Sequence, residues 1–142
     1  MKQIGKLNRK YYFALNKHDN YKVTTCPKCN KQTFKKKIPL FMFIKDHGFI
    51  ILGITCIYCA KCKLIITNQS ELESYLVSLF EKINPNIIGN EYFVVGTMDL
   101  KEWKKRINND EKRSLEQEVE FISDFKGLLE LNYQPAGWYR NV

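Results

Sequence analysis

Two pairs of closely spaced cysteines constrain this chain more than any other feature of its sequence. Two residues separate the cysteines of each pair, and residues 30–58 separate the two pairs. Four thiolates spaced in this way can surround one tetrahedral metal ion, because each pair forms a tight turn and a hairpin between them can bring the turns together. We therefore predict a metal site with four cysteine ligands. The two pairs are Cys26-Pro27-Lys28-Cys29 and Cys59-Ala60-Lys61-Cys62.

The fifth cysteine, Cys56, leaves a second choice of ligands open, because two residues also separate Cys56 from Cys59. Those two residues, Ile57 and Tyr58, favour a strand, whereas the residues that precede Cys62 tolerate a tight turn. We expect Cys62 to be the ligand and Cys56 to pack as a small hydrophobic side chain.

The run CPKC followed by Asn30, a central β-hairpin and the run YCAKCKLII resemble the zinc-ribbon fold group. They are most similar to short prokaryotic zinc-ribbon proteins of uncharacterised function, in which a helix and an EYFVVGT-like strand follow the ribbon. The resemblance covers roughly residues 21–105 and implies a structural Zn²⁺ ion. The residue after each pair is often glycine in that group, whereas this chain has Asn30 and Lys63. The ligands implied by the resemblance are Cys26, Cys29, Cys59 and Cys62.

Other uses of these cysteines fit the sequence less well. A thioredoxin-like redox site lies between a strand and a helix, but residues 35–38 continue as a strand. A rubredoxin-like iron site uses the same four thiolates, although such electron carriers are usually acidic and this region is basic. Four protein ligands leave no open position for a hydrolytic water. We expect His18 and His47 to be solvated, and we identify no catalytic constellation, so the sequence does not indicate an enzyme.

Strand-forming residues dominate the middle of the chain. β-Branched and aromatic side chains favour strands from Tyr21 to Thr67. A hairpin is expected over residues 39–58, with its turn at residues 45–48. A further strand is expected over residues 91–100, and residues 1–20 favour a short helix or strand.

Two amphipathic helices are predicted after the strands. The first covers residues 70–83 and begins with a capping box formed by Ser70 and Glu73. The second covers residues 114–131 and begins in the same way. An aromatic tail with Trp138 follows it.

The predicted hairpin is apolar on both faces. Leu40, Met42 and Ile44 point to one face, whereas Phe41 and Phe43 point to the other. Both faces must therefore be covered, by the two helices, by the N-terminal segment or by a second copy of the chain. We expect an α+β fold in which an antiparallel zinc-ribbon sheet with an extended apolar hairpin is covered by two amphipathic helices. The expected segments are 1–20, 21–67 (the ribbon), 68–107 and 108–142.

The net charge of +8 is concentrated in the first half of the chain. Residues 1–67 contain 14 basic and 2 acidic side chains, whereas residues 68–142 contain 9 basic and 13 acidic ones. Lysines that meet phosphates and aromatic rings that stack on bases are typical of nucleic-acid binding. The alternative is a protein–protein adaptor or a homo-oligomer that binds no nucleic acid. The candidate nucleic-acid contacts are Lys28, Lys31, Lys35, Lys37, Lys61, Lys63, Phe34 and Tyr58.

Cysteine usage also bears on the compartment. An odd number of cysteines does not indicate a disulfide scaffold, and residues 1–20 lack an unbroken apolar stretch. We therefore expect a cytoplasmic protein. Charged residues interrupt the apolar stretch Ile38–Cys59, so no membrane span is expected. The sequence identifies no small-molecule substrate.

Overall fold

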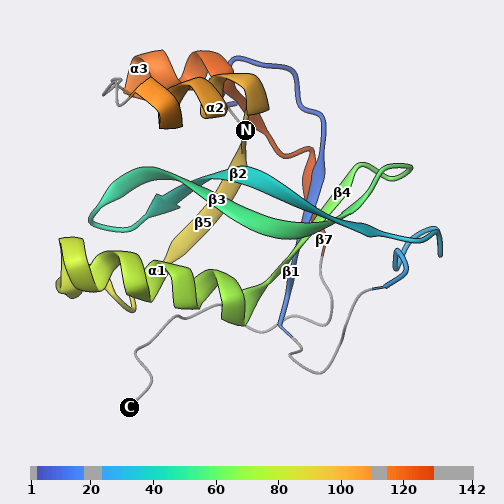
Figure 1. Cartoon of the computed structure of the whole chain (residues 1–142), viewed down its shortest axis with the longest axis horizontal. Coiled ribbons are helices and arrows are strands. Elements are labelled where there is room, and N and C mark those ends of the chain that lie inside the picture. Colours follow the sequence, from blue (N-terminus) through green and yellow to red (C-terminus); the bar gives the residue numbers. More distant parts are fainter. Residues whose placement is uncertain (1–2, 18–23, 110–114, 130–142) are drawn as a thin grey trace.

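The computed structural model describes residues 3–17, 24–109 and 115–129 of the chain. These residues form one sheet that curls into a half-barrel, with helices on opposite sides of it (Figure 1). The strands are β1 (Tyr12–Asn16), β2 (Phe34–Ile44), β3 (Gly48–Cys59), β4 (Leu64–Asn68), β5 (Tyr92–Met98), β6 (Ile122–Asp124) and β7 (Gly127–Leu129). The α-helices are α1 (Gln69–Ile83), α2 (Leu100–Asn109) and α3 (Leu115–Glu118), and two 3₁₀ turns are η1 (Pro85–Ile87) and η2 (Val119–Phe121).

The hairpin of β2 and β3 is the longest antiparallel pairing in the sheet, and it confirms the predicted hairpin over residues 39–58. Its turn places Asp46 at φ 67° and Gly48 at φ 113°, and Gly48 pairs with Ile44. Glycine adopts such angles without a steric penalty, because it has no Cβ atom. The local sequence was therefore sufficient to place this hairpin.

The expected antiparallel zinc-ribbon sheet covered by two amphipathic helices is wrong. The sheet has seven strands in the order β6-β5-β2-β3-β4-β1-β7, and it is mixed, because β1 pairs in parallel with both β4 and β7. The N-terminal strand β1 thus lies inside the sheet, with Phe13 and Ala14 buried. Parallel pairing joins segments that are far apart in the sequence, so no local pattern could predict it.

The predicted helix over residues 114–131 is also wrong. Among residues 115–129, the part of this range that the structure describes, only α3 and η2 are helical. The chain then forms β6, which pairs with β5, and β7, which pairs with β1. The buried Asp124 carboxylate accepts hydrogen bonds of 2.7 Å from the backbone N–H groups of both Ile4 and Gly5. These long-range contacts override the local helical period.

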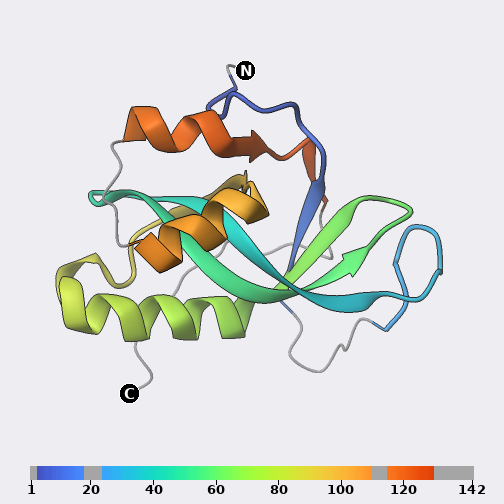
Figure 2. The ribbon, with the colours of Figure 1, turned by 45° about the horizontal axis from the view of Figure 1, so that its top comes forward.

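Both faces of the hairpin are covered, as its sequence requires. The inner face of the half-barrel, which carries Leu40 and Met42, packs against α1. The outer face, which carries Phe41, packs against Ile122 and against Trp103 of α2. Figure 2 shows α1 and α2 on the two sides of the sheet. The sequence did not predict α2, which takes the covering role expected of the C-terminal helix.

Helix α1 confirms the first predicted helix, but Asn68 caps it instead of Ser70. The Asn68 side chain accepts a hydrogen bond of 3.0 Å from the backbone N–H of Glu71. The helix ends before Asn84, next to Pro85, as predicted. The predicted strand over residues 91–100 is confirmed as β5. The tail with Trp138 lies outside the described residues.

Candidate metal centre

The first cysteine pair lies in a tight turn just before β2. The backbone N–H of Cys26 donates to the Lys31 carbonyl over 2.8 Å, and the N–H of Asn30 donates to the Cys26 carbonyl over 2.9 Å. The N–H of Lys28 lies 3.4 Å from the Cys26 sulfur. These bonds fold the loop so that the sulfurs of Cys26 and Cys29 face the same space.

The second cysteine pair lies in the turn between β3 and β4. Cys59 is the last residue of β3, and Cys62 precedes β4 by two positions. The residue after each pair is in the left-handed region, with Asn30 at φ 61° and Lys63 at φ 55°. The two turns therefore share the same left-handed backbone conformation, at the positions where zinc ribbons often have glycine.

The two turns bring four sulfur atoms together. All four lie within 4.8 Å of one another, with 3.8 Å between Cys26 and Cys62 and 3.6 Å between Cys29 and Cys59. In a regular tetrahedron with zinc–sulfur bonds of about 2.3 Å, neighbouring sulfurs are about 3.8 Å apart. The thiolate cage therefore has the dimensions that a tetrahedral metal ion requires, and the cluster could hold one.

The cluster is sheltered by apolar residues on the outer face of the sheet. Cys26 and Cys59 are buried, and they pack with Ala14, Leu64 and Ile66 from β1 and β4. Cys29 and Cys62 are half-buried at the surface. The site is thus anchored on one side in the core.

Crowding of the sulfurs changes their acidity. Hydrogen bonding with the neighbouring Cys29 raises the pKa of Cys62 to about 12, and burial raises the pKa of Cys59. The pKa of Cys29 falls to about 7, chiefly because the backbone N–H of Lys31 donates to its sulfur. Four thiolates at these distances repel one another, so a cation is needed to keep them all ionised.

Cys56 lies apart from this cluster. Three positions separate it from Cys59 on β3, and successive side chains of a strand alternate, so the two point to opposite faces. Cys56 is buried in the inner core, and its sulfur lies 3.2 Å from the Thr67 hydroxyl. Burial raises its pKa to about 11. These positions agree with the prediction that Cys56 packs as a hydrophobic residue.

The candidate nucleic-acid residues are distributed unevenly. Phe34 is 49% exposed, whereas Tyr58 is 7% exposed and contacts the Phe34 ring edge-on at 5.4 Å between ring centroids. Lys36 lies over the Tyr58 ring and Lys37 over the Trp103 ring, so strand alternation places them on opposite faces. The exposed lysines near the two turns are Lys28, Lys31, Lys35, Lys61 and Lys63.

Of the two histidines, His18 lies outside the described residues. His47 is exposed in the β2–β3 turn and contacts the Phe80 ring edge-on, with 4.8 Å between ring centroids. It lies at the end of the hairpin opposite to the cysteine turns.

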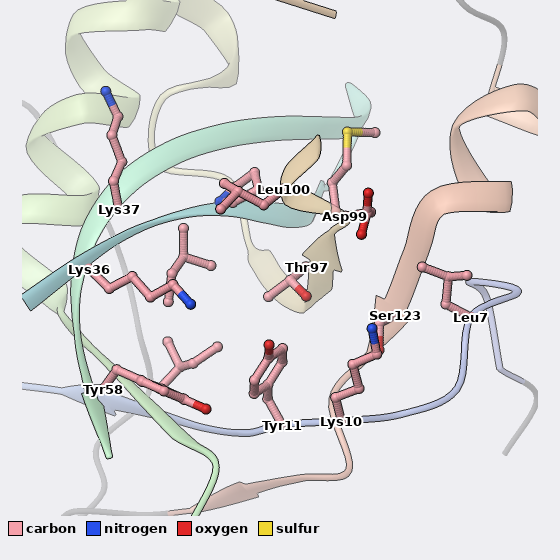
Figure 3. Close-up of a pocket in the computed structure, with 14 residues that line it drawn as sticks. Leu7, Lys10, Tyr11, Lys36, Lys37, Tyr58, Thr97, Asp99, Leu100 and Ser123 are labelled. Atoms are coloured by element: carbon pink, nitrogen blue, oxygen red, sulfur yellow. The ribbon is translucent and has the colours of Figure 1, made fainter. Parts of the chain in front are cut away.

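A pocket on the inner face was not predicted. We call it the inner pocket; Lys10 and Tyr11 from the N-terminal segment, Lys36 from β2 and Thr97 from β5 contribute to its lining (Figure 3). These residues come from strands that only the tertiary fold brings together. The basic and aromatic composition of residues 9–13 was the one signal of it in the sequence.

Comparisons with protein families, with curated proteins and with solved structures found no match to this chain. The resemblance to zinc ribbons therefore depends on the cysteine residues and their geometry alone. Among the described residues, no helix has the length and apolar character needed to cross a membrane.

Proposed function

We propose that this protein binds one structural zinc ion through Cys26, Cys29, Cys59 and Cys62. The observation that carries the proposal is the agreement between the sulfur separations of 3.8 and 3.6 Å and those of a tetrahedral zinc site. Four protein ligands fill the coordination sphere, so the ion would link the two turns and would not activate water. Structural zinc binds zinc-finger peptides with an apparent free energy of roughly 10–16 kcal/mol, and here that free energy would hold the two cysteine turns together.

The test is the metal content of the purified protein, measured by native mass spectrometry and elemental analysis. We expect one zinc ion per chain, and we expect Cys26→Ser, Cys29→Ser, Cys59→Ser and Cys62→Ser each to lose most of it. Cys56→Ser is the matched control, because the same atom is changed outside the cluster, and it should retain zinc. Iron with a visible absorption band, or zinc loss in Cys56→Ser alone, would contradict the proposal.

A second proposal is that the basic region beside the metal centre binds nucleic acid. It is supported by five exposed lysines around the two turns and by Phe34, whose ring is 49% exposed and could stack on a base. The alternative is a protein partner or a second copy of the chain. That alternative is supported by Phe93, which is 57% exposed on β5.

Titration with single-stranded and duplex nucleic acid at two salt concentrations tests this second proposal. Binding should weaken as salt increases, because counterions are released from the phosphates. Lys31→Glu and Lys61→Glu should weaken binding, whereas Lys82→Glu at the exposed end of α1 should change it less. An absence of binding at low salt would eliminate the proposal and leave the protein-partner alternative.

A further inference from the structure

The inner pocket has an apolar lining with a few polar groups directed into it. Its volume is about 130 Å³, and Ile38, Pro39, Met98 and Leu100 contribute apolar surface. Figure 3 shows the Tyr11 hydroxyl between the ammonium groups of Lys36 and Lys10, close to Thr97. Convergent polar groups in an apolar hollow are characteristic of small-ligand sites.

Lys36 is the positioned cation of this pocket. Its ammonium group lies 5.3 Å from the centroid of the Tyr58 ring, and this contact orients it. Among the described residues no carboxylate forms an ion pair with Lys36. Its charge therefore remains available to an anionic ligand.

The neighbouring hydroxyls add hydrogen-bond donors. The Tyr11 and Tyr58 rings meet edge-on, with 5.9 Å between their centroids, so their hydroxyls border the same hollow. Burial raises the pKa of Tyr11, which keeps that hydroxyl protonated and able to donate at neutral pH. Lys36 and the two tyrosines thus offer three donors to the oxygens of one anion.

Asp99, the acidic residue of the pocket lining, already accepts a hydrogen bond within the protein. Its carboxylate accepts a hydrogen bond of 3.3 Å from the backbone N–H of Glu102 and so caps the start of α2. Lys10 also lines the pocket on that side, as Figure 3 shows. The cationic lining therefore exceeds the anionic one, which favours an anion over a cation.

We propose that the inner pocket binds the phosphate group of a small phosphate monoester through Lys36, Tyr11 and Tyr58. A phosphate carries up to two negative charges and three acceptor oxygens, and lysine binds it as a point charge. Pockets for drug-sized ligands measure about 300–1,000 Å³. A volume of about 130 Å³ therefore limits the enclosed part to the phosphate and a few adjoining atoms. The phosphate could belong to a free nucleotide or to the 5′ end of an oligonucleotide.

Calorimetric titration of the metal-loaded, full-length protein tests this site. The probes are uridine monophosphate, uridine, succinate, and a short oligonucleotide with and without a 5′ phosphate. Uridine monophosphate should bind saturably, and uridine and succinate should bind at least tenfold more weakly. Tighter binding of the 5′-phosphorylated oligonucleotide than of both uridine monophosphate and the unphosphorylated oligonucleotide identifies a nucleic-acid end as the source. Tighter binding of uridine monophosphate than of the 5′-phosphorylated oligonucleotide identifies a free nucleotide.

Lys36→Gln should weaken uridine monophosphate binding at least tenfold, and Tyr11→Phe should weaken it several-fold. Lys45→Gln is the matched control: the same charge is lost from the exposed turn between β2 and β3, which does not line the inner pocket, and affinity should change less than twofold. Equal effects of the two lysine variants, equal binding of succinate, or no saturable binding would overturn the proposal. These outcomes are independent of zinc content, so they separate this site from the proposed metal centre.

Discussion

The residues that follow each cysteine pair show how much a single position contributes to the metal centre. Lys63 has a positive φ of 55° although it is neither glycine nor asparagine. Left-handed geometry costs most residues about 1–2 kcal/mol, whereas asparagine tolerates it better. The second turn therefore stores strain that the first turn, with Asn30, largely avoids.

Replacing Lys63 by glycine should relieve this strain. We expect Lys63→Gly to raise the free energy of unfolding of the zinc-loaded protein by about 1 kcal/mol. The measurement is urea denaturation at a fixed zinc concentration. Lys61→Gly is the control in the same turn, where no positive φ needs relief, and it should give no gain. A loss of stability in Lys63→Gly would show that the lysine side chain matters more than its backbone.

Glu73 makes stability depend on pH through one side chain. Burial raises the pKa of this carboxyl above its ordinary value, although the Tyr92 hydroxyl donates to it over 2.7 Å. The folded state therefore holds the proton more tightly than the unfolded state. Its stabilising contribution is complete below the unfolded pKa and is lost as the pH rises through the folded pKa.

Glu73→Gln removes this titration while it preserves the size of the side chain. We expect the stability of the wild-type protein, relative to Glu73→Gln, to decrease between pH 4 and pH 7. Both proteins carry the same metal centre, so the pH dependence of metal binding cancels in the comparison. Parallel stability curves, measured by denaturation at several pH values, would exclude this role for Glu73.

At the scale of the elements, helix α2 is attached to the outer face by an aromatic side chain that packs on a glycine. Trp103 lies so close to Gly53 of β3 that a Cβ atom on Gly53 would collide with its ring. Lys37 also lies beside this ring, with its ammonium group 5.8 Å from the centroid. The bare glycine backbone is thus what lets α2 approach the sheet.

Gly53→Ala should destabilise the protein by about 1–3 kcal/mol, the usual cost of overpacking. Trp103→Ala should remove the collision, so the effect of Gly53→Ala should be smaller in the double variant than in the wild type. Thermal or urea denaturation of the four proteins measures this coupling. If the stability losses of Gly53→Ala and Trp103→Ala simply add in the double variant, then the Trp103 ring does not exclude a side chain at position 53.

At the scale of the whole molecule, the metal centre and the main core occupy different parts of one sheet. The four cysteines lie in the turn before β2 and in the turn between β3 and β4, whereas residues 40–44 of β2 pair with strands on both sides. The core around these residues includes α1 and contains no metal ligand. Loss of the metal should therefore affect the molecule unequally.

Chelation should expose the cysteine turns first. We expect amide hydrogen exchange to become at least tenfold faster in residues 26–33 and 59–64 after verified metal removal. Residues 40–44 should remain protected, because their backbone bonds and core contacts do not depend on the ion. Equal acceleration throughout the chain would indicate that zinc controls global folding, and no acceleration would argue against a structural metal.

Several parts of the fold and of the site were predictable from local patterns. The cysteine spacing identified Cys26, Cys29, Cys59 and Cys62, which the structure brings within 4.8 Å of one another. The turn with Gly48 and the helix before Pro85 were placed correctly, because backbone geometry and hydrogen bonding limit those residues to few conformations.

Other parts depended on partners that are distant in the sequence. β1 is a strand because it pairs with β4 on one side and with β7 on the other. Residues 122–124 form β6 instead of the expected helix, because they pair with β5 and because Asp124 binds the backbone N–H groups of Ile4 and Gly5. The amphipathic period of residues 115–129 could not reveal these contacts. Helix α2 was missed because its anchor, Trp103, is defined only by its contact with Gly53.

The chain therefore carries its metal-site chemistry in its primary structure, because the spacing within each cysteine pair is a local property of a tight turn. The mixed order of the sheet, the choice of covering helices and the inner pocket were decided only in the tertiary structure. Each of these requires segments that are distant in the sequence to pack together, and the stabilising packing contacts and hydrogen bonds leave no local pattern.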